Sequence, residues 1–183
     1  MKETDLSTFN NSWYRPGNKV KIIIWYFMNA TFLTNPFFPF SKPKIWLLKL
    51  FGAKIGKGVL IKPRVSVKYP WKLKIGNHVW IGEKVWIDNL GMVTIEDHVC
   101  ISQGAMLLCG NHNYKKSTFD LIVGDIKLEK GSWVGAHAVV CPKVTIASHS
   151  ILTVNSVAVK STEPYFIYQG NPAEKLRERK IGQ

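Results

Sequence analysis

The chain has 183 residues, of which 46% are hydrophobic, so it is long enough for one domain with a sizeable core and short for two. Met1 leads into polar residues and not into an apolar segment, so we expect no secretory signal and a cytoplasmic protein. The net charge of +13 is concentrated early: residues 1–72 hold 13 Lys and Arg against two acids, whereas residues 73–183 hold 12 against 10. This basic third predicts an anionic neighbour, and charge alone leaves a membrane surface, an acidic glycan, a phosphorylated lipid carrier and nucleic acid open.

Residues 1–54 are predicted to form a helical extension before the main fold. Residues 19–33 are dense in aromatic and aliphatic side chains but too short to span a bilayer. Residues 41–52 have Pro near the start and Gly at the end, as a capped helix does. We expect the first segment to cover an open end of the main fold; the alternative is a membrane-surface helix, which nearby lysines favour. These lysines are Lys19, Lys21, Lys42, Lys44 and Lys49.

Residues 55–163 carry a repeat of six residues. Fifteen aliphatic positions recur, usually followed four residues later by a small or β-branched residue. They are Ile55, Ile61, Val67, Ile75, Ile81, Ile87, Ile95, Ile101, Leu107, Leu128, Val134, Val140, Ile146, Leu152 and Ala158. One large and one small residue per short strand would fill a triangular coil of three hexapeptides, whereas sandwich strands alternate with period two. The pattern predicts an all-β solenoid, a parallel β-helix of about five coils and roughly 24 Å in length at ~4.8 Å per coil.

Glycine often follows the aliphatic residue, as in Gly76, Gly82 and Gly135. We expect it to supply the backbone conformation that a corner of the prism needs. The repeat is interrupted three times, always after the third hexapeptide of a coil: two extra residues follow Val67, two follow Ile87 and fifteen follow Leu107. All three insertions therefore leave at one corner, and the longest is predicted as an extruded loop over residues 109–125.

Residues 164–183 are predicted to form a C-terminal tail. Asn171-Pro172-Ala173 has the pattern of an N-cap followed by Pro at the first helical position. A short charged helix over residues 174–180 is therefore expected.

Several segments match a known family. They are Leu50-Phe51-Gly52-Ala53-Lys54-Ile55-Gly56, Tyr69-Pro70-Trp71, Trp80-Ile81-Gly82-Glu83, Asn89-Leu90, Ile101-Ser102-Gln103, Asn111-His112-Asn113-Tyr114, Ser132-Trp133-Val134-Gly135 and Gln169-Gly170-Asn171-Pro172-Ala173. Over nearly the whole chain the sequence resembles the bacterial hexapeptide-repeat O-acetyltransferases, most closely the colanic-acid-biosynthesis acetyltransferase type. The resemblance implies a left-handed β-helix and a homotrimer with active sites between neighbouring prisms. It also implies direct transfer from acetyl-CoA without an acyl-enzyme.

His112 lies where this family places its catalytic histidine, in the loop between the third and fourth coils. The resemblance implies that it takes the proton from the acceptor hydroxyl as general base, a task suited to imidazole because its pKa lies near working pH. The alternative is a solvated loop histidine. Relatives often carry Asp after this histidine, where the chain has Asn113, so we expect electrostatic support for the imidazolium either to be weaker or to come from Asp88 or Asp120.

The resemblance also implies a coenzyme A site. Trp133 and Ala136 match residues at the pantetheine and acetyl end, and Val154 and Val159 match residues that contact the pantetheine arm by main chain. Lys160 and Arg177 match residues that neutralise phosphates, although ordinary solvated charge is the alternative for both, as inter-prism packing is for Trp133. Glu174 stands where some relatives have a second phosphate-binding arginine. Candidate acceptor-binding residues on the insertion edge are Asp88, Asn89, Asn113 and Tyr114, of which Asp88 and Asn89 could equally form turns.

A metal site is not expected. Cys100, Cys109 and Cys141 are odd in number and lack CxxC spacing, which predicts reduced, buried thiols and neither a disulfide framework nor a structural zinc site. Four histidines lie three residues after an aliphatic position, on outward turns: His78, His98, His137 and His149. A γ-class carbonic anhydrase shares the fold but needs three clustered histidines on zinc, a pattern that His112 does not complete.

The predicted function is therefore acetyl-CoA-dependent O-acetylation of a sugar hydroxyl on an exopolysaccharide or capsule intermediate, on a lipid carrier at the inner face of the membrane. One alternative is a small-sugar or antibiotic acetyltransferase with the same chemistry. Another is a structural or nucleic-acid-binding β-helix, although the sequence has no recognition motif for nucleic acid and we expect none as a partner.

Overall fold

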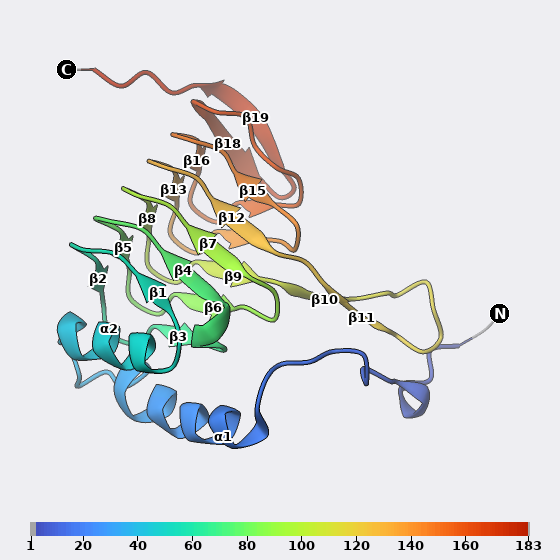
Figure 1. Ribbon diagram of the computed structural model, residues 1–183. Coiled ribbons are helices and arrows are strands. Elements are labelled where there is room, and N and C mark those ends of the chain that lie inside the picture. The colour runs from blue at the N-terminus through green and yellow to red at the C-terminus, as the bar shows by residue number, and fades with distance from the viewer. Residues whose placement is uncertain (1–2, 183) are drawn as a thin grey trace.

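The computed structural model describes residues 3–182, and most of its strands are short, run parallel and build a triangular prism (Figure 1). Face I consists of β1 (Lys54–Ile55), β4 (Leu73–Ile75), β7 (Val93–Ile95), β12 (Ile126–Leu128) and β15 (Thr145–Ile146). Face II consists of β2 (Leu60–Ile61), β5 (Trp80–Ile81), β8 (Cys100–Ile101), β13 (Trp133–Val134), β16 (Ile151–Leu152), β18 (Phe166–Gly170) and β19 (Ala173–Glu178). Face III consists of β3 (Ser66–Val67), β6 (Trp86–Asp88), β9 (Met106–Leu108), β14 (Val139–Val140) and β17 (Val157–Ala158). Five complete coils are thus followed by β18, which begins a sixth.

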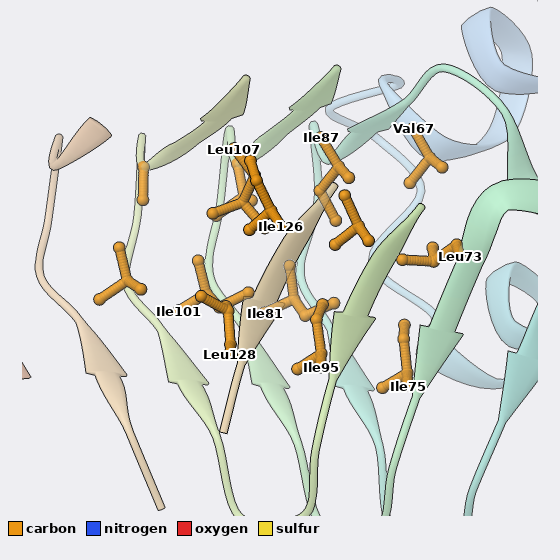
Figure 2. Close-up of a cluster of buried hydrophobic side chains, with 14 of the residues drawn as sticks. Val67, Leu73, Ile75, Ile81, Ile87, Ile95, Ile101, Leu107, Ile126 and Leu128 are labelled. Atoms are coloured by element: carbon orange, nitrogen blue, oxygen red, sulfur yellow. The ribbon is translucent and has the colours of Figure 1, made fainter. Parts of the chain in front are cut away.

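The six-residue repeat builds the core of this prism. Of the fifteen aliphatic positions, fourteen are buried, and Ile55 in the first coil is half-buried against the same cluster. Equivalent residues stack in register: Ile61 pairs with Ile81 on the neighbouring strand. Figure 2 shows Ile81 beside Ile101 of the next coil. The large apolar residues therefore fill the inside of the triangle, as the repeat predicts.

The corner glycines have a different role from the predicted one. The residue with left-handed backbone is not Gly76 or Gly82 but the residue two positions later, His78 at φ 55° and Lys84 at φ 59°. Gly82 is instead required by a close approach of successive coils, since a Cβ there would lie 2.6 Å from the backbone nitrogen of Gln103. The glycine therefore makes room for the backbone of the next coil and does not relieve strain in its own backbone.

Two helices lie across the open end of the first coil (Figure 1). They are α1 (Lys19–Met28), continued by the π-helical segment η2 (Asn29–Leu33), and α2 (Ser41–Leu50). Trp25 donates from Nε1 to the carbonyl of Val67 at 2.8 Å, and Ser41 Oγ bonds both backbone groups of Ile61 at 3.0 Å. The helices thus satisfy polar groups that the first strands would leave unpaired at an exposed edge.

The predicted C-terminal helix over residues 174–180 is wrong. Residues 173–178 form β19, which pairs antiparallel with β18 from Gly170↔Ala173 to Phe166↔Glu178. A helix of seven residues is marginal in water without packing, whereas β18 offers the tail a free strand edge. The tail therefore closes the last edge of face II.

The three insertions leave at the corner between faces III and I, as predicted. They follow β3, where they include the short 3-10 turn η3 (Pro70–Lys72), then β6 and β9. The cysteines are free thiols; Cys109 is buried, but Cys100 and Cys141 are only half-buried. Within residues 3–182, no helix has the length and apolar character needed to cross a membrane.

Candidate active site

The longest insertion is an antiparallel hairpin that projects from the prism (Figure 1). It consists of β10 (Gly110–His112) and β11 (Leu121–Val123), and His112 pairs with Leu121 at the outer end of the ladder. The loop of residues 113–120 follows directly. His112 is therefore held on regular backbone where the hairpin opens into its tip.

The side chain of His112 is fixed by Phe119. Its Nδ1 lies 2.9 Å from the carbonyl oxygen of Phe119, and the two rings stack with centroids 4.4 Å apart and planes 7° apart. Because a carbonyl oxygen only accepts, Nδ1 must carry the proton, and in the neutral ring Nε2 then holds the lone pair. Phe119 has a left-handed backbone at φ 50°, a costly conformation for a bulky residue that aims its carbonyl at the imidazole. The geometry leaves Nε2 ready to accept a proton.

The N-terminal arm, residues 3–18, was predicted to belong to the helical extension, but it runs beside this hairpin (Figure 1), and its one helical turn is the 3-10 segment η1 (Leu6–Thr8). The backbone nitrogen of Asp5 donates to the carbonyl of Ser117 at 2.9 Å, and the ring of Phe9 lies 5.7 Å from that of His112. Farther along, the Tyr14 hydroxyl donates to the carbonyl of Leu90 at 2.8 Å. In the sequence, the aromatic residues of this otherwise polar arm were the one sign that the arm packs against the rest of the protein.

The insertion edge beside the hairpin is held together by polar contacts. Asn89 is fully buried, and its amide accepts from the nitrogen of Tyr69 at 2.9 Å and donates to the carbonyls of Tyr69 and Lys72. These bonds favour the turn-forming role for Asn89, because both amide hydrogens are used and the buried side chain is not accessible to a sugar acceptor. Asp88 pairs with Lys68 at 2.8 Å and stays partly accessible. Burial raises the pKa of the Tyr14 and Tyr69 phenols, which keeps them protonated.

The carboxylates expected to support His112 have other partners. Asp120 accepts from Lys116 at 2.8 Å and from the Thr118 hydroxyl at 2.6 Å, and Asp88 is paired with Lys68. The carbonyl of Phe119 takes the position that these acids were predicted to fill. A backbone acceptor needs no particular residue type, so no side chain in this segment could have indicated it.

Two further candidates lie in the hairpin tip. Asn113 forms the turn after β10: its nitrogen donates to the carbonyl of Asp120 at 2.8 Å, and its side chain accepts from the nitrogen of Lys115 at 3.1 Å. Tyr114 is 77% exposed and is therefore available to a ligand.

A second group of candidates lies on face II. Trp133 on β13 and Arg177 on β19 line an open pocket of about 630 Å³ with Ile151 and Ile167. Trp133 donates from Nε1 to Ser102 Oγ at 2.8 Å, which fixes its ring on the face. Arg179 and Lys180 add positive charge, although Arg179 is bound to the carbonyls of Gly131 and His149. The β19 strand, unforeseen in the sequence, forms one wall.

The remaining coenzyme A candidates lie at corners of the prism. Ala136 and the exposed Val154 are on successive coils at the corner between faces II and III, where Asn155 donates from its nitrogen to the carbonyl of Ala136. The exposed Val159 and Lys160 follow β17 at the corner between faces III and I. In a triangular prism this corner, which also carries the His112 hairpin, lies opposite face II. One chain therefore does not bring His112 and the Trp133 pocket together.

No family model matches the chain. A solved hexapeptide-repeat-containing acetyltransferase from Vibrio cholerae shares the fold, with a TM-score of 0.80 at 22% identity, covering 89% of this chain and 93% of that one. A galactoside acetyltransferase solved with coenzyme A also shares it, with a TM-score of 0.76 at 22% identity over 87% and 80% of the two chains. The "Putative colanic acid biosynthesis acetyltransferase WcaF" of Escherichia coli (strain K12) is 36% identical over 176 residues, 96% of this chain and 97% of that protein. The chain belongs to the hexapeptide-repeat acetyltransferases.

Membership of this acetyltransferase family confirms two predictions. The prism is a left-handed parallel β-helix, and the protein is an acyltransferase. Among residues 3–182 of this acetyltransferase, there is no group of three or more His, Cys, Asp or Glu side chains placed to hold a metal ion.

Proposed function

We propose that this acetyltransferase transfers the acetyl group of acetyl-CoA directly to a sugar hydroxyl, with Nε2 of His112 as general base. Nε2 takes the hydroxyl proton as the oxygen attacks the thioester carbonyl. The tetrahedral intermediate then expels the CoA thiolate, which receives the proton from the imidazolium. The observation that carries this proposal is the 2.9 Å contact between His112 Nδ1 and the Phe119 carbonyl, which selects the tautomer a base needs.

The donor site that we propose combines the Trp133 pocket with the cations beside it. Coenzyme A has an anionic end and an apolar-linked arm, and the pocket offers Arg177 and Lys180 next to Trp133, Ile151 and Ile167. We include in the proposed donor site the coenzyme A candidates at the corners of the prism, which are Ala136, Val154, Val159 and Lys160. The structures that share this fold include one named as a complex with acetyl coenzyme A and one with coenzyme A.

A homotrimer would complete the site. The side chains that point outward from face II are apolar, as are most of those from face III, whereas face I presents mainly cations. On face II they are Leu60, Trp80, Cys100, Trp133 and Ile151; on face III, Ser66, Trp86, Met106, Val139 and Val157; on face I, Lys54, Lys74, Thr94, Lys127 and Thr145. Burying face II of one chain against face III of the next forms a closed ring. It also places the His112 hairpin of one chain beside the Trp133 pocket of its neighbour.

The acceptor that we propose is a lipid-linked intermediate of an exopolysaccharide or capsule, acetylated at the inner face of the membrane. The name of the Escherichia coli relative, with its reference to colanic acid, supports a polysaccharide, and the basic first third of the chain supports an anionic carrier. The acceptor-binding candidates that remain are Asp88, at the base of the hairpin near Gly110, and Asn113 and Tyr114 in its tip.

Replacing His112 by Ala tests the chemistry. The variant should lose about 10²- to 10⁴-fold in kcat while retaining acetyl-CoA binding in calorimetry, and added imidazole should restore part of the rate. Release of the CoA thiol is measured with lipid-linked oligosaccharides and with free sugars, and mass spectrometry locates the acetyl group. Full activity in the variant would refute the mechanism, and efficient transfer to free sugars alone would favour the small-sugar alternative.

Mixed trimers test the shared site. The His112→Ala and Trp133→Ala chains are refolded together, and each parent is refolded alone. A mixed trimer contains one site with an intact hairpin and an intact pocket, so activity should exceed that of both parents. Activity no higher than the parents in confirmed mixed trimers would mean that each chain holds its own complete site.

A further inference from the structure

We propose that the α1–η2–α2 cap is a docking surface for a bilayer that contains anionic lipids. This inference concerns where the enzyme sits and is independent of the acetyl-transfer chemistry, because it rests only on the cap. The helices that close the first coil present a second, outward side on which several large apolar side chains are exposed.

The outward side of α1 is an apolar stripe. Val20, Ile23, Ile24 and Phe27 follow one another at intervals of three, one and three residues, which puts them on one helical face, and all four are exposed. The inward side is used by the buried Trp25, which bonds to Val67. The helix therefore has apolar side chains on both sides, and only the inward ones are accounted for by packing on the prism.

The stripe continues across a groove onto α2. The groove has a volume of about 430 Å³ and is lined by apolar side chains from α1, η2 and α2, among them Ile24, Phe32, Trp46 and Leu50. Trp46 is 65% exposed, and Phe37 in the connection is 91% exposed. An apolar surface of this kind on one end of a protein marks an interaction site.

The charges around the cap favour an anionic lipid surface as its binding partner. Between Asp5 and Glu83 the chain has 13 Lys and Arg and no acidic residue. Lys19, Lys42 and Lys49 are exposed on the helices themselves. A second copy seated on this face would bring two sets of these cations together, whereas an anionic lipid surface neutralises them. Apolar side chains flanked by lysines are what an interfacial helix uses to enter a membrane.

Docking by the cap would orient the site. The cap lies at the end of the prism opposite the C-terminus, and β9, from which the His112 hairpin emerges, belongs to the third coil (Figure 1). Two coils at ~4.8 Å each and a helix layer of ~10 Å separate the start of the His112 hairpin from the lipid surface, so the hairpin begins roughly 20 Å above that surface. The acceptor hydroxyl would then belong to a glycan that extends outward from its lipid carrier.

Vesicle flotation tests the proposal without substrate. The trimer or monomer as purified should bind vesicles of phosphatidylglycerol and phosphatidylcholine in equal parts, and should bind phosphatidylcholine vesicles far less. The Lys42→Gln/Lys49→Gln variant should bind the anionic vesicles about 25-fold more weakly, since each surface lysine contributes about fivefold. The Lys130→Gln/Lys143→Gln variant has the same net charge and should bind as the wild type does.

A second pair of variants tests the apolar stripe. Ile23→Ser/Phe27→Ser should weaken binding by at least about tenfold, and Leu6→Ser/Ile181→Ser, which alters exposed apolar residues elsewhere, should not. Equal losses in a cap variant and its matched control, or no binding by the wild type, would overturn the proposal. So would dissociation of the oligomer by Ile23→Ser/Phe27→Ser in light scattering, which would make the cap an interface between copies. Acetyl transfer to a free acceptor reports separately on the catalytic proposal.

Discussion

Replacing Phe9 by Ala should slow catalysis without weakening the binding of acetyl-CoA. The Phe9 ring lies 5.7 Å from the His112 ring at 56°, while Phe119 stacks on that ring at 4.4 Å. An aromatic pair contributes about 0.5–1.5 kcal/mol, so losing one neighbour should reduce the population of the productive imidazole orientation about 2- to 13-fold. Because Phe9 contacts the base and not the Trp133 pocket, the loss should appear in kcat.

The assay is steady-state release of the CoA thiol at saturating acceptor, with acetyl-CoA varied. Leu6→Ala is the matched control, because Leu6 lies on the same arm and is 65% exposed. Imidazole orientation is read independently from the ring proton resonances of His112 by NMR. A Phe9→Ala enzyme with unchanged kcat, or with a raised KM for acetyl-CoA as its only defect, would refute the idea that the arm holds the base.

Three further predictions concern stability and reactivity. Gly82→Ala should destabilise by about 1–3 kcal/mol in urea, since its Cβ would approach Gln103, whereas Gly182→Ala meets no atom within 4 Å and should be neutral. Ile101→Ala should cost about 2–5 kcal/mol and Ile101→Val about 0.5–1.5, because the side chain is 1% exposed in the central coil. Burial raises the pKa of Cys109 to about 12, so iodoacetamide should label it only after unfolding. Its contribution to stability should be complete below pH ~8.5, the pKa of an unfolded thiol, and should be lost as the pH rises from there toward about 12, which the urea midpoint measures.

The N-terminal cap shows which features a local sequence pattern can predict and which it cannot. The 41–52 segment was recognisable as a helix from Pro43 and Gly52, and the structure has α2 over Ser41–Leu50. The bonds that seat the cap join residues far apart in the chain, such as Trp25 to Val67 and Lys44 to the carbonyl of Lys62. No local spacing encodes such pairs, so these contacts could not be predicted from the sequence.

The prism itself and the corner that carries His112 were determined by the sequence alone. The reason is that each hexapeptide repeats the same local geometry, so the period and its interruptions count the coils and locate the corner. The orientation of His112 was decided only by tertiary structure, because its neighbours Phe9 and Phe119 come from an arm and a loop outside the repeat. The same holds for β19: local preference favoured a helix at 174–180, and the free edge of β18, which exists only once the prism has folded, made that segment a strand.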